Sequence, residues 1–290
     1  MFISSYEKLR ERLISDATIT TLVQLEYSGF DGATVPICTF ALQNKYRKEY
    51  RGGYVRLSDF RGSENQGPKT LEAVAKPNCG WFYCASADDF KKIPGSPISY
   101  WISPKAILAY EGGDIIGKTC YGQPGLQTSN NGRFVRLWPE VSQTTIELNC
   151  KSSEHSQELD ARWFPYLKGG GFRKWYGNHE HVVDWQNQGA RIKRYVTEKY
   201  PYLNGNIDYV IKDRGYYFRS CISYSYITSA AFSARFSGAG FIFDVAGSSI
   251  IPETGQEMLF LAFLCSCLTP IFANAQNPTL NLQIGDTAIP

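Results

Sequence analysis

The sequence predicts an α+β protein, and three observations lead to that prediction. The chain has 290 residues, of which 43% are hydrophobic, so it can bury a sizeable core. Its first 60 residues combine one helical repeat with short β-rich runs. Residues 120–243 are rich in glycine, aromatic side chains and short alternating runs. We therefore expect the remnant of an α/β sheet, followed by an irregular, mainly β domain with a few helices.

The first element is a helix of about ten residues, since apolar side chains recur at helical spacing at Tyr6, Leu9, Leu13 and Ile14. Ser4 and Glu7 have the spacing of a capping box, which predicts the helix start. Three β-rich runs follow at 20–27, 34–44 and 52–60, the first two separated by the turn-like segment 28–33. A helix and strands without a preceding partner strand indicate the end of a longer sheet.

The polar segment 61–70 predicts a surface loop or a domain boundary. Segment 87–103 contains prolines that keep any helix there short. Further on, alternating runs at 132–138, 144–149, 181–185 and 215–228 predict strands, and 184–203 predicts a helix that ends at Pro201. The expected organisation is 1–60 as the sheet remnant, 61–118 as a connecting region and 119–290 as the mainly β domain.

The balance of charged residues excludes a strong electrostatic field over the whole protein. The chain carries 30 Lys and Arg against 27 Asp and Glu, a net charge of +3, so any polyanion site must be local. Eight cysteines without a secretion signal are typical of reduced, mostly buried thiols, and we expect a cytoplasmic protein. The most apolar stretch, 258–268, is shorter than the roughly 20 residues that span a bilayer. It therefore predicts a buried helix rather than a membrane contact.

No pattern in the sequence brings catalytic groups together. No Pro-Pro pair occurs, so the Asn/Asp-Pro-Pro-Tyr motif that holds a flipped base in amino-directed methyltransferases is absent. Residues 236–247 match the glycine pattern of an S-adenosylmethionine loop only weakly, and we interpret them as a turn that enters a strand. His179 and His181 alternate as on a strand but lack a nearby third ligand, so we predict no metal site. We expect neither catalytic nor cofactor-binding residues in this chain.

Segment 162–185 has the composition of a binding loop. Three consecutive glycines lie between two aromatic clusters, and basic side chains are interleaved with the rings. Glycines allow a close backbone approach, basic groups neutralise phosphates, and aromatic rings stack on bases. Between Lys168 and Arg214, nine Lys and Arg face five Asp and Glu, which concentrates positive charge there. The structural alternative is a simple turn, with Trp163, Phe164 and Trp175 in the core.

Segment 124–141 is a second candidate surface. Its polar centre 127–132 carries Gln, Thr, Ser and Asn side chains and is followed by Arg133 and Arg136. Gln and Asn can bond adenine in two places, and Arg can do so with guanine. The alternative is an Asn-Gly hairpin tip whose polar groups face water.

Several strings occur in the order found in a known family. These are "PGLQTSNNGRFVRLWPEV", "KGGGFRKWYGN", "FSGAGFIFDVAGSSIIP" and "LAFLCSCLTPIFANAQNPTL", with "MFISSYEKLRERLI" and "KIPGSPISYWIS" upstream. In them the chain resembles the BREX phage-resistance adenine-specific DNA methyltransferases (PglX type), with a Taq-like target-recognition domain. Members of that family are longer. Their catalytic domain binds S-adenosylmethionine and flips adenine for N6 methylation.

The resemblance implies a non-catalytic specificity portion of a phage-defence or restriction-modification methyltransferase. Residues 1–60 would be the end of the methyltransferase domain, 119–290 would recognise double-stranded DNA, and the front part with its cofactor would be missing. Phosphate contacts are expected from Lys168, Arg173, Lys174, Arg191, Lys193 and Arg194. Base or backbone contacts are expected from Gln127, Thr128, Asn130, Arg133, Gly169, Gly170, Trp175, Tyr176 and Asn178. The alternative is an assembly module that binds other phage-defence proteins.

Overall fold

The computed structural model describes residues 4–30, 32, 37–113, 115–116, 120–123, 125–212, 215–225 and 232–276. These residues belong to two compact units. The N-terminal unit comprises residues 1–113, 274–279 and 290, and the C-terminal unit comprises residues 114–273 and 280–289. The predicted segment 1–60 and most of 61–118 therefore share one unit, and their assignment to different domains stays a prediction. Pro124 and Arg214 lie outside the described residues.

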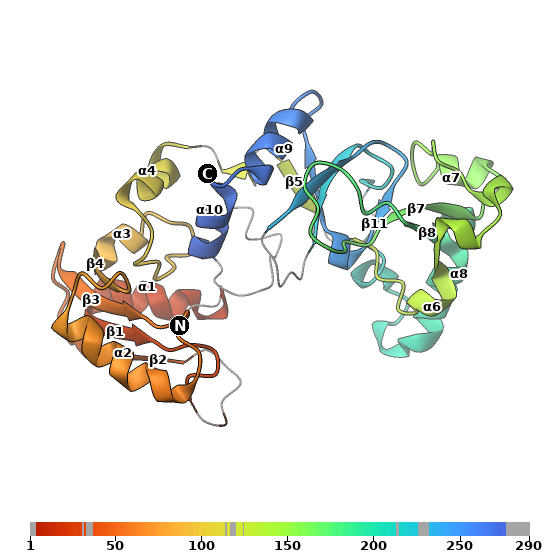
Figure 1. Ribbon diagram of the computed structural model, residues 1–290. Helices are drawn as coiled ribbons and strands as arrows, with labels where there is room; N and C mark the ends of the chain where they lie inside the picture. Colours follow the sequence, from red (N-terminus) through yellow and green to blue (C-terminus); the bar gives the residue numbers. More distant parts are fainter. Residues whose placement is uncertain are drawn as a thin grey trace. The chain divides into compact units, whose positions relative to one another are not determined.

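The N-terminal unit is built on a four-stranded sheet (Figure 1). Its strands are β1 (Thr18–Gln24), β2 (Cys38–Gln43), β3 (Arg51–Arg56) and β4 (Phe82–Ser86), in the order β2-β1-β3-β4. β1 and β3 pair in parallel, whereas β2 and β4 pair antiparallel to their neighbours. The three predicted β-rich runs each overlap one of the first three strands, so these predictions are confirmed.

Helices α1 and α2 pack on this sheet and bury two separate cores. The helices of the unit are η1 (Ser4–Tyr6), α1 (Glu7–Asp16), α2 (Ser63–Ala75), α3 (Ala87–Phe90) and α4 (Pro104–Gly112). One core joins Ile14 of α1 to Leu22 and Tyr54 of the sheet, where Tyr54 stacks on Tyr100 with centroids 4.8 Å apart. The other joins Val55 to Ala73 of α2. The predicted ten-residue helix is confirmed, but no side chain caps α1, so the predicted capping box is wrong.

The polar segment 61–70 is not a loop, because α2 begins at Ser63 and continues through Pro68. Tertiary contacts explain the difference. The Gln66 side chain is 5% exposed, donates to the carbonyl oxygens of Phe60 and Gly62, and accepts from the amide of Glu26. These bonds fix the start of α2 to the sheet, although the local sequence favours a turn.

The C-terminal unit contains two four-stranded sheets. One has the order β10-β9-β12-β5 and the other β11-β7-β8-β6. The strands are β5 (Cys120–Gln123), β6 (Val135–Leu137), β7 (Trp163–Leu167), β8 (His181–Asp184), β9 (Cys221–Tyr224), β10 (Ala234–Ser237), β11 (Ile242–Phe243) and β12 (Ser249–Pro252). Short strands and irregular connections match the predicted mainly β domain, and the α+β class is confirmed. The predicted strand at 144–149 is wrong, since only Ile146 forms a bridge there.

The helices of this unit are short except for α8. They are α6 (Asn131–Phe134), α7 (His155–Glu158), α8 (Gln186–Lys199) and α9 (Glu257–Cys265), with 3-10 turns η2 (Trp138–Glu140), η3 (Gln143–Thr145), η4 (Pro201–Leu203), η5 (Ile207–Tyr209) and η6 (Val245–Gly247). Helix α10 (Thr269–Gln276) begins in this unit, and its residues 274–276 belong to the N-terminal unit. The predicted helix before Pro201 is confirmed as α8, with Ile192 and Val196 buried. Its regular geometry begins only after Gly189, because 187–189 have positive φ.

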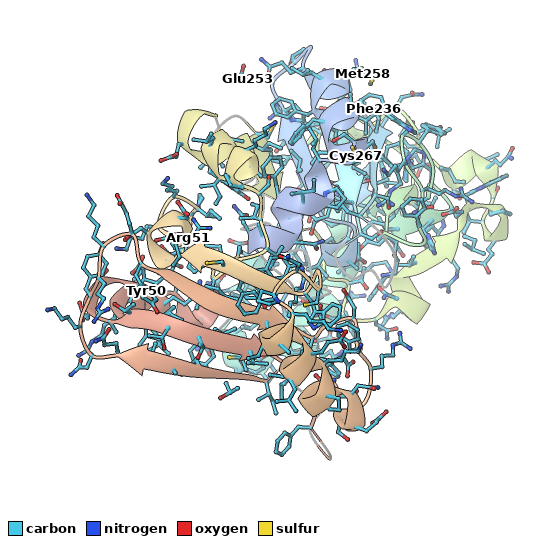
Figure 2. The ribbon with its side chains drawn as sticks, turned by 60° about the vertical axis from the view of Figure 1, so that its left-hand side comes forward. Tyr50, Arg51, Phe236, Glu253, Met258 and Cys267 are labelled. Carbon is cyan, nitrogen blue, oxygen red and sulfur yellow. The ribbon has the colours of Figure 1, made fainter. Side chains whose placement is uncertain are left out.

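Helix α9 is only partly buried, contrary to the expectation for 258–268. Leu261, Leu264 and Cys265 are buried, but Met258 and Leu259 are 56% and 70% exposed. Figure 2 labels Met258 on this helix. No single described helix is long and apolar enough to cross a bilayer, although α9 and α10, bent by 76°, pass that test as a pair.

Candidate nucleic-acid interface

Residues 168–178 and the polar centre 127–132, which belong to the two segments selected from the sequence, both follow one edge of the β7 sheet. β11 pairs with β7 in parallel, and Leu126 bridges Asp244 in parallel just beyond β11. Parallel segments have their carboxyl ends at the same edge of a sheet. Gln127 and Lys168 therefore both follow that edge, which we call the carboxyl edge. The fold thus brings together residues that lie 41 positions apart in the chain.

Residues 168–178 form a loop that we call the glycine loop. An ion pair with a buried carboxylate holds its beginning. The Lys168 ammonium lies 2.7 Å from Asp244, whose side chain is 5% exposed and also accepts from the Tyr166 hydroxyl at 2.7 Å. Lys168 therefore neutralises a buried carboxylate and is less available to a phosphate than predicted. Gly169 has φ of 79°, and a Cβ there would lie 2.6 Å from the carbonyl oxygen of Ala246. Only glycine fits at that position.

The next two glycines turn their carbonyl groups into the protein. Gly170 has φ of 111° and its carbonyl oxygen accepts from Ser225 Oγ at 2.9 Å. The Gly171 carbonyl oxygen accepts from Asn178 Nδ2 at 3.0 Å. Asn178 is 7% exposed and has φ of 61°, so its side chain is committed to the loop rather than to a ligand. Both glycines nevertheless lie exposed at the surface.

Three aromatic rings of the same loop are exposed. Phe172, Trp175 and Tyr176 have exposed fractions of 51%, 53% and 70%. The backbone beneath them is fixed, because the Trp175 amide donates to Ala234 and its carbonyl accepts from the amide of Phe236 in β10. Trp163 and Phe164 are buried as the structural alternative predicted, but Trp175 is not in the core. Exposed rings on a fixed backbone can stack on bases or pack against a protein.

The basic residues of the loop have different surroundings. Arg173 is 58% exposed and lies 3.6 Å from Glu180, which is 48% exposed. Such an exposed ion pair contributes little to stability, so Arg173 can exchange Glu180 for another anion. Lys174 is partly buried, and its ammonium donates at 2.6 Å to the carbonyl oxygen of Cys265, the last residue of α9. Lys174 therefore compensates the negative end of that helix.

His179 has a structural environment. Its Nε2 lies 2.9 Å from Ser237 Oγ, and its ring contacts Tyr176 and Phe241. Burial lowers the pKa of His179, Glu180 opposes that shift, and Arg235 adds to it. Within the described part of the chain no three His, Cys, Asp or Glu side chains group as metal ligands. His179 is thus a packed side chain next to the loop.

The second candidate segment is a helical turn and not a hairpin. Asn130 Oδ1 accepts from the amide of Arg133 at 3.1 Å and caps α6. Thr128 is 2% exposed and donates to Asn131 Oδ1, so it cannot reach a base in this conformation. Gln127, Asn131 and Arg133 are exposed. The side chains of these three residues can form the hydrogen bonds that are expected with base edges.

Helix α8 adds residues that sequence reasoning missed. Arg133 and Lys199 both lie over the ring of Tyr195, at 5.4 and 5.6 Å from its centroid. Asn130 Nδ2 donates to the Tyr195 hydroxyl, and Lys199 donates to the carbonyl oxygen of Ser129. We call Asn130, Arg133, Tyr195 and Lys199 the α6–α8 surface. The only sequence signal was the four-residue spacing of Tyr195 and Lys199 on one helix.

The remaining basic candidates lie away from the carboxyl edge. Arg191 and Arg162 share one oxygen of Asp184, at 2.5 and 3.1 Å. Asp184 pairs with Trp163, the first residue of β7, at the opposite end of that strand. The basic excess seen in the sequence is therefore divided between two ends of the sheet. Lys193 lies 5.7 Å from the ring of Trp185, while Arg194 is exposed.

The glycine turn at Gly238–Gly240 does not fit S-adenosylmethionine. Gly240 has φ of 100°, and a Cβ there would lie 2.1 Å from the carbonyl oxygen of Leu148. Gly240 is packed directly against another backbone, whereas Gly238 has open space, and the turn leads into β11, as predicted. A glycine of a cofactor loop needs open space for the ligand. Gly240 therefore cannot serve as a glycine of such a loop.

Comparison with solved structures identifies a related fold. The chain superimposes on part of MmeI, a type IIL restriction-modification enzyme, with a TM-score of 0.52 and 11% sequence identity, over 94% of this chain and 35% of MmeI. At this identity the likeness shows the fold. No family model matches the chain.

Two curated relatives match almost the whole chain. Over 98% of its length the chain is 36% identical to the adenine-specific methyltransferase PglX of Lacticaseibacillus casei (strain Zhang). Over 99% it is 30% identical to the adenine-specific methyltransferase BrxX of Escherichia coli O9:H4 (strain HS). It spans 24% and 22% of their lengths. The chain is thus related, along almost its whole length, to one part of the PglX-type methyltransferases, as the sequence resemblance predicted.

Proposed function

We propose that this chain supplies DNA target recognition to an adenine-specific methyltransferase and that the methyl transfer depends on residues outside it. The observation that carries the proposal is the exposed set Phe172, Trp175 and Tyr176, held on a fixed backbone at the carboxyl edge. In a chain related to methyltransferases, such rings suit contact with nucleic acid. MmeI, which has a similar fold, was solved in complex with DNA.

In this proposal two surfaces contact the DNA. The loop 168–178 brings exposed aromatic rings and Arg173, and the α6–α8 surface brings the exposed side chains of Arg133 and Lys199. Gln127 precedes that surface and is exposed. Arginine and amide groups read base edges, and lysine neutralises phosphate. Five residues position these surfaces in our proposal, because each is at least partly buried and already has an intramolecular partner: Lys168, Lys174, Thr128, Asn130 and Asn178.

Duplex DNA binding tests the proposal. We expect binding to weaken steeply with salt and Trp175→Ala to cost about 1–3 kcal/mol. Tyr27→Ala is the matched control, since Tyr27 is 56% exposed but belongs to the N-terminal unit. Fluorescence anisotropy at several salt concentrations measures both effects on this chain and on the full-length protein. Equal losses for Trp175→Ala and Tyr27→Ala, or binding that is independent of salt, would contradict DNA recognition.

Helix α9 favours a second candidate function, assembly with another protein. Met258 and Leu259 present exposed apolar side chains on one helix, which is typical of protein contact surfaces. Leu259→Lys should leave the free energy of unfolding within about 0.5 kcal/mol, because the side chain is 70% exposed. If assembly is the function, this variant abolishes association in sedimentation experiments and leaves DNA binding unchanged.

A further inference from the structure

Three consecutive backbone amides of the glycine loop have no acceptor. Among the described residues, the amides of Gly170, Gly171 and Phe172 donate no hydrogen bond. The carbonyl groups of Gly170 and Gly171 are used by Ser225 and Asn178. In a trans peptide the N–H points opposite to the C=O. The amides of Gly171 and Phe172 therefore point away from these two partners.

The space in front of Gly171 is open. A Cβ at Gly171 would meet no atom within 4 Å, and its φ is not positive. Neither backbone strain nor packing requires glycine at this position, in contrast to Gly169. The absence of a side chain at Gly171 instead leaves the neighbouring amides accessible. Such a position suits close approach by a ligand.

A buried positive charge lies behind the same loop. Arg235 is 1% exposed, and its Nε has no hydrogen-bond partner among the described residues. Its guanidinium donates to the hydroxyl groups of Ser225 and Ser233, at 3.2 and 3.4 Å, and no described carboxylate pairs with it. Ser225 in turn donates to Gly170. Two consecutive hydrogen bonds thus connect the guanidinium to the loop.

The local charge balance is positive. Lys168 is compensated by Asp244 and Arg173 by Glu180. Lys174 donates to a neutral carbonyl, and Arg235 donates to neutral hydroxyls. Because an uncompensated buried cation is costly, an anion next to the loop would stabilise this arrangement. The same field attracts phosphate to the exposed amides.

We infer that the amides of Gly170, Gly171 and Phe172 form a binding site for one phosphodiester group of the DNA backbone, with Arg235 and Lys174 supplying positive charge behind it. Successive free N–H groups form anion-binding concavities in other proteins. The site rests on the proposed function and adds the contact that places the aromatic rings beside the bases. It contacts no base edge, so it acts equally on every sequence.

Gly171→Val tests the site, since the added side chain would cover the amides but meets no neighbour in the fold. Gly112→Val is the matched control, because Gly112 also has open space and no positive φ. We expect Gly171→Val to keep the urea midpoint of wild type, to weaken binding of all duplexes alike, and to lower the log–log salt slope by about 1. Gly112→Val should also keep the urea midpoint, and it should change neither the duplex binding nor the salt slope.

Phosphate titration followed by amide NMR separates this site from the proposed function. In wild type, inorganic phosphate and duplex DNA should both shift the Gly170, Gly171 and Phe172 amide resonances, and Gly171→Val should remove both effects. If Gly171→Val leaves the salt slope unchanged while Trp175→Ala still weakens DNA binding, the phosphate site is wrong. That result remains consistent with DNA recognition. Shifts with inorganic phosphate but not with DNA overturn the assignment to the DNA backbone. Loss of DNA recognition itself shows as no duplex binding by wild type.

Discussion

Asn178 shows how one residue holds the candidate loop. Its side chain closes the turn onto Gly171, and its own backbone has φ of 61°. Asparagine tolerates this left-handed conformation better than other side chains do, apart from glycine. Asn178 therefore supplies both a side-chain hydrogen bond and a tolerated positive φ, and alanine would supply neither.

Asn178→Ala should lower the free energy of unfolding by about 2–4 kcal/mol, because it removes a buried hydrogen bond and strains the backbone. Asn178→Gly should cost less, since it keeps the positive φ. Urea denaturation of both variants measures the difference. A glycine variant no more stable than the alanine variant would show that φ at residue 178 is not the constraint.

His179 predicts a pH dependence of stability. Its folded-state pKa lies below the ordinary value of 6.5, chiefly because of burial. The unfolded chain therefore binds the proton first, and the folded protein loses stability as the pH falls below 6.5. His179→Gln should flatten the unfolding free energy between pH 6.5 and 5.5. His155→Gln, in α7, is the control, and an equal effect of both variants would contradict the assignment.

At the scale of elements, α2 illustrates a helix that depends on its tertiary partners. The segment that starts it contains Gly62, Gly67 and Pro68, which favour a turn. Gln66 satisfies two carbonyl groups and one amide in the N-terminal unit and so connects the helix to β1. The helix forms because these buried bonds outweigh the local preference.

Gln66→Ala should therefore destabilise the protein by about 2–3 kcal/mol, since it leaves buried polar groups without partners. The control Glu64→Ala, two residues earlier in the same helix, should change stability by less than about 1 kcal/mol because Glu64 is exposed. Thermal and urea denaturation compare the two. Similar effects would mean that α2 is held by packing alone.

At the scale of the whole molecule, the question is what the chain can do alone. Its length is about a quarter of the PglX relative that it matches. The sequence lacks the Asn-Pro-Pro-Tyr motif, and the Gly240 turn is closed by Leu148. In our proposal, recognition and methyl transfer depend on different parts of a longer protein.

We expect calorimetric titration of this chain with S-adenosylmethionine to show no saturable binding. The physical reason is the contact between Gly240 and the Leu148 backbone, which leaves no room for a ligand at the second glycine of the weak motif match. A full-length relative that binds the cofactor is the positive control. Micromolar binding by this chain would contradict the assignment of the cofactor to other residues.

The sequence by itself determined the α+β class, the first helix, the first three strands, α8 and the family relationship. These features depend on local periodicity or on residue strings, which need no knowledge of distant contacts. It also selected the glycine loop, since glycine, aromatic and basic residues in one segment are visible without a structure.

Only the tertiary structure decided which selected residues remain available to a ligand. Lys168 pairs with Asp244, Thr128 donates to Asn131, and Asn178 donates to Gly171. Arg235 is buried behind the loop. The partners of Lys168 and Asn178 lie more than one helical turn away in the sequence, so no local pattern reveals these pairs. Whether a polar side chain binds a ligand or stabilises the fold is set by its partners in space.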